Sequence, residues 1–271
     1  MKRSKWDQRI RRADELTSSH PFAVEVLRFY KGIATFQKEF YAHLDAVRGN
    51  GLRQKAGGLF DQDLDLPLLL PTFQEFLARV GAFSPAPVAE SAANLRKQPA
   101  ARCEDLLSFH WRKPSDSHSA LDETETLLAW IFLQPYAEFL ADRGEHNPGN
   151  DGVAVCPFCG GKPSVGVLRP EGDGAKRFLI CALCSTEWAF RRILCASCGE
   201  EAVEKLAVYT ANEFNHVRVE GCDTCQRYIK TVDLTKNGLA VPVVDELATI
   251  PLNLWAQEHG YTKLQPNLLG I

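Results

Sequence analysis

Four Cys-x-x-Cys pairs are the residues of this chain whose type and spacing most directly indicate chemistry. Two intervening residues allow a tight turn to direct both sulfurs at one ion, and two such turns supply four thiolates in tetrahedral geometry. Structural zinc and iron are both bound in this way. The pairs lie in the second half of the sequence, at Cys156 and Cys159, Cys181 and Cys184, Cys195 and Cys198, and Cys222 and Cys225.

The pairs form an internal repeat, which indicates how they combine. Each copy contains one pair, a gap with a short predicted hairpin, and a second pair. Two tandem modules explain this pattern best. We therefore predict one metal site from the four cysteines within 156–184 and another from the four within 195–225. A crossed assignment between the modules is the alternative.

The sequence allows several roles for these metal sites. The simplest is that both metals only hold a partner-binding surface in shape. A catalytic zinc site keeps an open position with three protein ligands, whereas these sites are closed by four. A redox dithiol of the thioredoxin type needs a βαβ context that the pattern lacks. Zinc and iron accept the same four sulfurs, and only iron would allow one-electron chemistry. No catalytic triad or phosphate-binding loop is present, so we expect a protein that is not an enzyme, with no catalytic residue and no organic cofactor.

Other reactive residues have simpler interpretations. Cys103 lies alone in a predicted helix and is expected to be a buried, small apolar residue. His216 is expected to lie at the surface or to pack against a hairpin, because eight cysteines already fill two sites. The basic residues before Ala13 are expected to form a solvated helix face.

The elements that position the cysteines change character along the chain. Apolar residues recur at spacings of three and four between Phe22 and Leu44, which predicts a helix with one buried face. Thr72 and Glu75 form a capping-box pattern that predicts a helix start. Two further helices are predicted, over residues 99–111 and 121–142, with a kink or break in the second near Pro135.

After a turn-rich linker at 145–152, the pattern switches to short strands between the cysteine pairs. The predicted fold class is α+β, with an N-terminal helical bundle, two tandem zinc-ribbon-like metal modules and a C-terminal helical tail. A tail helix is predicted from Asp245 to His259, interrupted at Pro251, and we expect it to pack back on the helical domain. The predicted strands cover residues 164–168, 177–180, 207–210 and 216–219. The predicted domains are 1–150, 151–192, 193–240 and 241–271.

Composition limits the classes of function. The chain has 271 residues, 45% of them hydrophobic, and a net charge of −3. Within 151–240, basic and acidic residues are equal in number, which disfavours nucleic-acid binding. A zinc-ribbon nucleic-acid-binding or transcription-associated protein is therefore the alternative reading.

The sequence also indicates a location. Asp7 and Gln8 interrupt any secretory signal, and the longest apolar stretch, 127–137, is too short to cross a bilayer. We expect a protein without a transmembrane segment that is cytoplasmic or peripheral at the cytoplasmic face of a membrane. A reducing compartment favours metal-bound thiolates over disulfides. Self-association is left open.

Five segments resemble the FdhE family, the accessory proteins of formate dehydrogenase. The resemblance covers residues 154–261, and the helical half matches only in general character. The matching segments are CPFCGGKPSVGVL at 156–168, LICALCSTEW at 179–188, LCASCG at 194–199, GCDTCQRYIKTV at 221–232 and the tail at 245–261.

The resemblance implies a cytoplasmic maturation factor with two rubredoxin-like modules. It implies that the eight cysteines hold iron in two mononuclear tetrathiolate sites, with zinc fitting the same ligands. It also implies a partner, the catalytic subunit of formate dehydrogenase, a molybdenum selenoenzyme that is exported folded by the twin-arginine route. The expected function is thus the assembly of active formate dehydrogenase.

Overall fold

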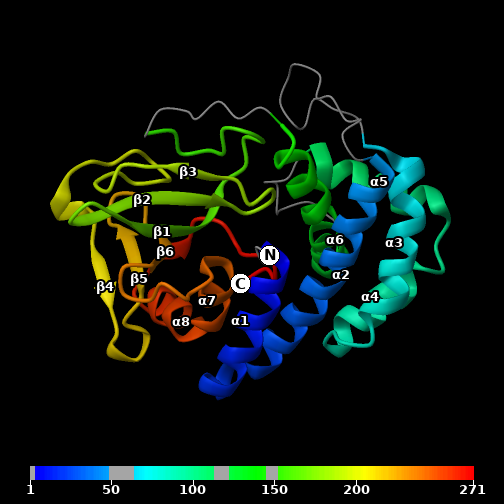
Figure 1. Cartoon of the computed structure of the whole chain (residues 1–271), viewed down its shortest axis with the longest axis horizontal. Coiled ribbons are helices and arrows are strands. Elements are labelled where there is room, and N and C mark those ends of the chain that lie inside the picture. The colour runs from blue at the N-terminus through cyan, green and yellow to red at the C-terminus, as the bar shows by residue number, and fades with distance from the viewer. Residues whose placement is uncertain (1–3, 49–63, 113–121, 145–151) are drawn as a thin grey trace.

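The computed structural model describes residues 4–48, 64–112, 122–144 and 152–271, and it has the predicted α+β architecture (Figure 1). Only Gly152 of the predicted linker lies within the described residues. The helical half comes first and contains α1 (Lys5–Ser19), α2 (Val24–Arg48), α3 (Leu66–Val80), α4 (Ala86–Leu95), α5 (Ala100–Arg112) and α6 (Glu123–Ala141).

Helix α6 lies at the centre of the helical half. Asp122 caps its start, because the side chain accepts hydrogen bonds from the backbone N–H groups of Thr124 and Glu125. The helix is buried on nearly every side after its first turn. Phe132 packs against Phe40 of α2, with ring centroids 4.9 Å apart. A helix that is apolar all round can be stable only inside a core, and here the other helices supply that core.

Two local predictions about the helices differ from the structure. Helix α3 begins at Leu66, six residues before the predicted capping box, because Pro67 in its first turn favours an earlier start. Helix α6 continues through Pro135 without a break. Proline has no N–H to donate to the carbonyl of Ile131, and the side chain of Gln37 donates to that carbonyl instead, at 2.8 Å.

The second half of the chain forms one seven-stranded sheet in the order β3-β2-β1-β6-β5-β4, with β7 paired to β6. The antiparallel hairpins β1–β2 and β5–β6 are joined by the parallel pairing of β1 with β6. The strands are β1 (Pro163–Glu171), β2 (Gly174–Cys181), β3 (Glu187–Ala189), β4 (Val208–Thr210), β5 (Val217–Cys222), β6 (Arg227–Asp233) and β7 (Thr262–Lys263).

The β1–β6 pairing requires a glycine. A Cβ atom added to Gly166 would lie 2.3 Å from the hydroxyl oxygen of Thr231. A larger residue there would have to displace the side chain of Thr231 in β6. The two metal modules are therefore parts of a single sheet.

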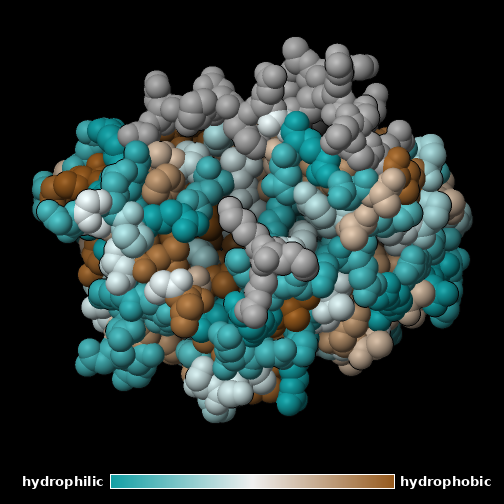
Figure 2. Space-filling model, viewed as in Figure 1, coloured by the Kyte–Doolittle hydropathy of each residue, from teal (hydrophilic) through white to brown (hydrophobic). Residues whose placement is uncertain are grey.

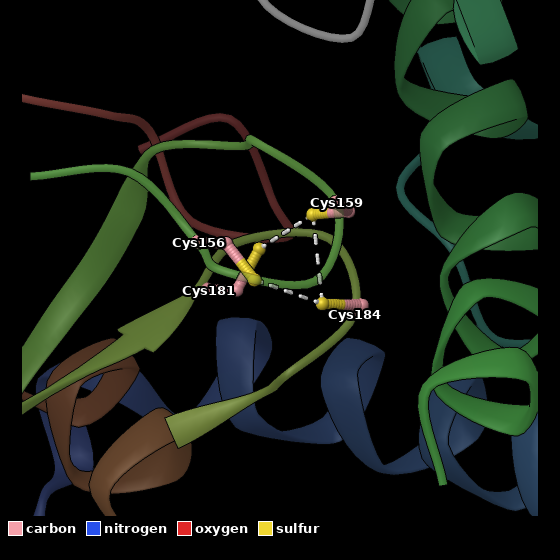
Figure 3. Close-up of side chains that lie close together, drawn as sticks. All are labelled: Cys156, Cys159, Cys181 and Cys184. Atoms are coloured by element: carbon pink, nitrogen blue, oxygen red, sulfur yellow. Dashed lines mark hydrogen bonds between the residues drawn. The ribbon is translucent and has the colours of Figure 1, made fainter. Parts of the chain in front are cut away.

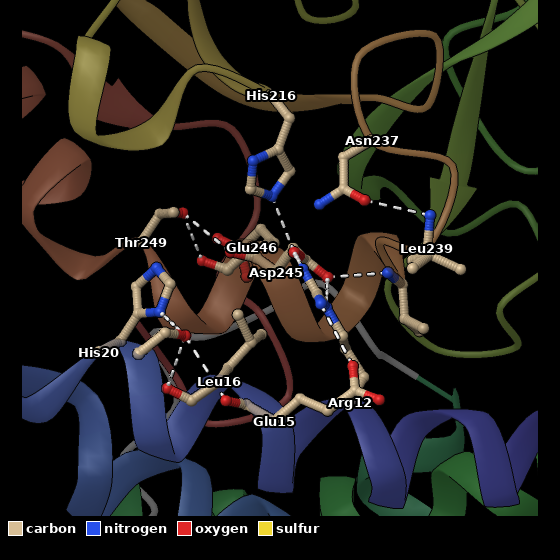
Figure 4. A network of polar contacts seen from close by, with 12 residues as sticks. Arg12, Glu15, Leu16, His20, His216, Asn237, Leu239, Asp245, Glu246 and Thr249 are labelled. Atoms are coloured by element: carbon tan, nitrogen blue, oxygen red, sulfur yellow. Dashed lines mark hydrogen bonds and ion pairs between the residues drawn. The ribbon is translucent and has the colours of Figure 1, made fainter.

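The C-terminal tail packs back on the helical half, as expected. It forms α7 (Pro242–Ala248) and α8 (Ile250–Glu258). Asp245 of α7 accepts hydrogen bonds from Arg12 of α1 at 2.6 Å and contacts His216 at 2.8 Å (Figure 4). This network joins the first helix, the sheet and the tail.

The prediction of a solvated basic face on α1 is wrong for two residues. Arg9 is only 7% exposed and pairs with Glu138 of α6 at 2.8 Å. Arg12 pairs with the buried Asp245. These positions lie on the side of α1 that faces the rest of the protein, so their charges are neutralised internally.

Two further observations concern the polarity of the surface and the apolar character of the helices. In the space-filling view much of this face is hydrophilic, and apolar side chains gather between hydrophilic ones over the sheet half (Figure 2). Among the helices that the structure describes, none has both the length and the apolar character that a membrane span requires.

Candidate metal centres

All four Cys-x-x-Cys pairs fold into the same type of knuckle. In the first, the N–H of Gly160 donates to the carbonyl of Cys156 at 2.8 Å, which closes a tight turn. The N–H of Cys156 donates to the carbonyl of Gly161 at 2.8 Å. The equivalent turn bonds in the second module join Gly199 to Cys195 at 3.1 Å. The repeat in the sequence is thus a repeat of local structure.

Each knuckle needs a left-handed backbone at the residue after its second cysteine. Two of these positions hold glycine, Gly160 at φ 71° and Gly199 at φ 78°. The other two hold Ser185 at φ 53° and Gln226 at φ 54°. Residues with a Cβ adopt this conformation at a cost, so the surrounding contacts must maintain it.

The first centre brings together the four cysteines predicted for it (Figure 3). Two pairs of sulfurs, Cys156 with Cys184 and Cys159 with Cys181, lie 3.5 and 3.4 Å apart. All four sulfurs lie within 4.8 Å of one another. Four sulfurs that surround zinc at 2.3 Å in a tetrahedron are about 3.8 Å apart. The donor set is therefore of the right type and nearly the right size for a tetrahedral metal ion.

The second centre brings together its predicted four cysteines in the same way. The sulfurs of Cys195 and Cys225 are 3.7 Å apart, and so are those of Cys198 and Cys222. The crossed assignment between the modules does not occur, since each group draws its cysteines from one module.

The two centres differ in exposure. In the first, all four cysteines are buried. In the second, Cys198 is exposed and Cys225 is intermediate, while Cys195 and Cys222 are buried. The second centre is therefore open to solvent on one side, and the first is enclosed.

Burial also governs the acidity of the thiols. Burial raises the pKa of Cys181 and Cys184 well above the usual range. In the same group, hydrogen bonds from the other three thiols lower the pKa of Cys156. In the second group, burial raises the pKa of Cys195 to about 12. A divalent ion would have to displace thiol protons to bind all four sulfurs, as metals do at such sites.

Residues of the helical half hold the first centre in place, and they were not among the residues predicted from the sequence. Gln134 of α6 donates to the carbonyl of Ala182, at 3.2 Å, inside the second knuckle. Ser185 donates to Glu138 of α6 at 2.7 Å and accepts from Arg9 at 3.2 Å. The signal was present, because Gln134 and Glu138 are polar residues one helical turn apart in an otherwise apolar segment.

Two other predicted residues can be placed, and one further residue packs near the first centre. Cys103 is fully buried in α5, as predicted. His216 packs beside β5 and contacts Asp245, so it belongs to neither cysteine group. The buried Trp188 donates to the carbonyl of Val153 at 2.9 Å and packs the strand segment beside the first centre.

Comparison with known proteins follows the same division of the chain. The family model described as FdhE, central domain, matches residues 155–192, and the model described as FdhE, C-terminal domain, matches residues 193–269. The chain belongs to the FdhE family. The matched segments contain both cysteine groups.

Curated relatives are named as FdhE homologues. The homologue from Aquifex aeolicus is 38% identical over 141 residues, which is 51% of this chain and 50% of the relative. The homologue from Shewanella oneidensis is 36% identical over 43% of this chain and 39% of the relative. These matches span half or less of the relatives' length. A Haemophilus influenzae homologue matches over 95% of this chain and 85% of its own length, at 23% identity.

A solved structure shares the complete FdhE fold. The crystal structure of the FdhE protein from Pseudomonas aeruginosa superposes with a TM-score of 0.71 at 23% identity. The match covers 99% of this chain and 97% of the other. It includes the helical half, where the sequence resemblance was only general.

Proposed function

We propose that this FdhE-family protein is an accessory factor in the maturation of formate dehydrogenase. In this proposal it is not an enzyme, and it binds the catalytic subunit in the cytoplasm. The observation that carries the proposal is the pair of tetracysteine groups, each of tetrahedral size, within an FdhE fold. The division of the chain into four segments, with boundaries at 150, 192 and 240, is part of the same proposal, with the second and third segments sharing one sheet.

The eight cysteines are proposed as the ligands of two iron ions, one in each group. Zinc would fit the same four sulfurs. Iron held by thiolates would supply one-electron redox chemistry, and zinc would supply only a structural link. The chain's own contribution is to fix the sulfurs through the knuckles, exclude water from the first centre and expose one side of the second.

A complementation experiment tests the role. Formate dehydrogenase activity would be measured in membranes of a strain that lacks this protein and carries either the wild type or the double variant Cys195→Ser, Cys198→Ser. We expect loss of activity on deletion and rescue by the wild type only. Ser197→Ala is the matched control, because it changes an exposed side chain between the same two cysteines. Unchanged activity on deletion, without a paralogue that compensates, would contradict the proposal.

A second experiment separates a redox use of the metal from a structural one. Metal content would be measured in protein isolated from its native host, and binding to the catalytic subunit would be followed by pull-down. A redox role predicts iron in at least one centre. Zinc in both centres with maturation intact would exclude electron transfer. A zinc-loaded form that fails to bind the subunit would exclude a purely structural role.

A further inference from the structure

The last strand of the sheet has an open edge. Strand β4 pairs with β5 on one side, and no described strand pairs with its other side (Figure 1). The carbonyl of Ala207 accepts a hydrogen bond from Gly221 of β5 at 2.9 Å. Backbone groups of successive residues in an antiparallel pair point alternately toward and away from the partner strand. The N–H and C=O groups of Val208 and Thr210 therefore point away from β5, toward the open side.

This edge has none of the side chains that usually protect an open strand. Residues 206–212 (LAVYTAN) contain no charge and no proline. Val208 is 53% exposed, and Thr210 is also exposed. Lysine, proline or a covering loop ordinarily prevents another chain from pairing with such an edge. An uncharged, accessible edge is therefore suited to pairing with another polypeptide.

A positively charged hollow lies on one face of this edge. Val208 and Thr210 lie opposite Glu220 and Arg218 of β5, and residues directly opposite each other share a face. The hollow on this face has a volume of about 380 Å³ and apolar walls. We call it the arginine hollow, because its charged lining consists of Arg177, Arg192, Arg218, Arg227 and Glu220.

The charges of the arginine hollow are not balanced by the residues that the structure describes. Arg177 and Arg218 share one carboxylate, that of Glu220. Arg192 and Arg227 have no carboxylate partner among the residues that the structure describes. Both are exposed at the hollow. The hollow thus has excess positive charge that an acidic side chain could neutralise.

An aromatic hollow lies on the other face. Tyr209 pairs with Val219 on this face and packs against Trp255 of α8, with ring centroids 4.5 Å apart. His20 stacks on Phe214 at 5.9 Å across the same hollow. Its volume is about 930 Å³, and among the described residues Glu213 is the only acidic one that lines it. This hollow is suited to large apolar side chains.

We propose that the edge of β4 binds an extended peptide as an additional strand, with acidic and apolar side chains in alternation. Successive side chains of a strand point to opposite faces. A peptide paired with Val208 and Thr210 would direct one set of side chains to the arginine hollow and the other to the aromatic hollow. The partner is therefore a segment in which aspartate or glutamate alternates with valine, isoleucine or phenylalanine. The arginine hollow adjoins the second metal centre, because Cys195 and Cys222 also line it, and the proposal holds whichever protein supplies the segment.

A second copy of this chain fits the edge less well than such a peptide. Pairing of β4 with its own copy would bring together Val208, Tyr209 and Thr210, none of which is acidic. Two arginine hollows would then lie near each other without a carboxylate to neutralise them. The charge pattern therefore favours a different polypeptide.

Synthetic peptides test the proposal on the full chain loaded with metal. The probe is a nine-residue peptide in which glutamate alternates with valine and phenylalanine. Three control peptides each carry one change. The first has lysine in place of glutamate. The second has the same composition with the glutamates grouped at one end, and the third carries N-methyl groups on alternate amides. We expect calorimetry to show binding of the probe and binding weaker by about tenfold or more for each control, because each loses its charge match, its alternation or its backbone pairing.

Two further measurements identify the surface. Amide exchange at Val208 and Thr210 should slow on binding, whereas Tyr209, whose N–H points to β5, should change little. Arg192→Gln with Arg227→Gln should weaken binding by about three- to tenfold, the effect of losing two partly exposed ion pairs. Arg191→Gln is the matched control, since this exposed arginine pairs with Glu201 and does not line the hollow. Equal affinity for all peptides, absence of binding, or a dimer of the free protein through β4 would overturn the proposal.

Discussion

Single residues set the size of the first metal centre. Gly161 follows the first knuckle, and a Cβ added there would lie 3.2 Å from the sulfur of Cys159 and 3.3 Å from that of Cys181. These contacts are tighter than a packed core tolerates without movement. The second module has Glu200 at the equivalent position. The requirement for glycine at the second position after the Cys-x-x-Cys pair is thus specific to the enclosed centre.

Gly161→Ala should weaken metal binding at the first centre and lower the free energy of unfolding by about 1–3 kcal/mol, the usual cost of overpacking. The added methyl group pushes two sulfurs away from their common position. Metal content per chain and thermal unfolding would be measured together. Gly174→Ala is the control, because its Cβ would meet nothing closer than 3.9 Å. Full metal occupancy in Gly161→Ala would show that the sulfurs have room to move.

A buried histidine should make the protein sensitive to acid. Burial lowers the pKa of His110 from 6.5 to about 4. Between pH 6.5 and 4 the imidazole is therefore protonated in the unfolded chain and neutral in the folded protein. The free energy of unfolding consequently falls as the pH drops from 6.5 toward 4. The loss reaches up to about 3 kcal/mol, since each pKa unit corresponds to about 1.4 kcal/mol. Urea unfolding of the wild type and His110→Leu at pH 7.5 and 5 would measure it.

The variant and its control predict opposite results. His110→Leu should reduce the difference in stability between pH 7.5 and 5, because the buried group no longer titrates. His43→Leu removes an exposed histidine from α2 and should leave that difference unchanged. An unchanged pH dependence in His110→Leu would assign the acid sensitivity to other groups.

At the scale of elements, helix α6 joins the helical core to the first metal centre. One face packs on α2 through Phe132, and another reaches the second knuckle through Gln134 and Glu138. Glu138 is fully buried and carries the charge that neutralises Arg9. The first centre consequently depends on a helix that lies outside its own module.

Glu138→Gln should be strongly destabilising, by about 3–5 kcal/mol, because it leaves the buried Arg9 without its charge partner. It should also loosen the knuckle at Ser185 and increase metal loss from the first centre. Chemical unfolding and metal release would be measured on the same samples. Asp142→Asn is the matched control, because Asp142 is half-exposed and pairs with Lys5, the lysine that also pairs with Glu138. Equal stability of both variants would show that Glu138 has no special structural role.

The sequence predicted the cysteine groups more accurately than the elements around them. Cys-x-x-Cys spacing is a local constraint, so both four-cysteine groups could be paired without a structure. Helix starts are less local, and Pro67 rather than the Thr72 pattern determines where α3 begins. Strand β6 and the parallel β1–β6 pairing depend on contacts between modules that no local pattern encodes. The role of Glu138 depends on α1 and Ser185, which are distant in sequence.

At the scale of the whole molecule, the two centres have different surroundings. The first lies within a hydrophobic core that contains residues of both the helical half and the sheet. The second is partly open to solvent, with Cys198 exposed. Because β1 and β6 pair directly, both centres nevertheless belong to one folded unit. Damage to the enclosed centre should therefore spread further than damage to the exposed one.

Chelation should remove metal from the two centres in a fixed order. Cys198 and Cys225 are accessible, so a chelator can reach the second centre in the native state. The first centre requires opening of the core before its metal can leave, and such openings are rare in a stable region. We expect the second metal to be lost faster by on the order of tenfold or more, with the helical signal in circular dichroism retained until the first metal is lost. Alkylation and mass spectrometry would follow the order by labelling Cys198 and Cys225 before Cys156 and Cys181. Simultaneous loss of both metals and of the helical signal would instead mean that the sheet and the helices open as one cooperative unit. The exposure of the second centre would then give its metal no separate route for release.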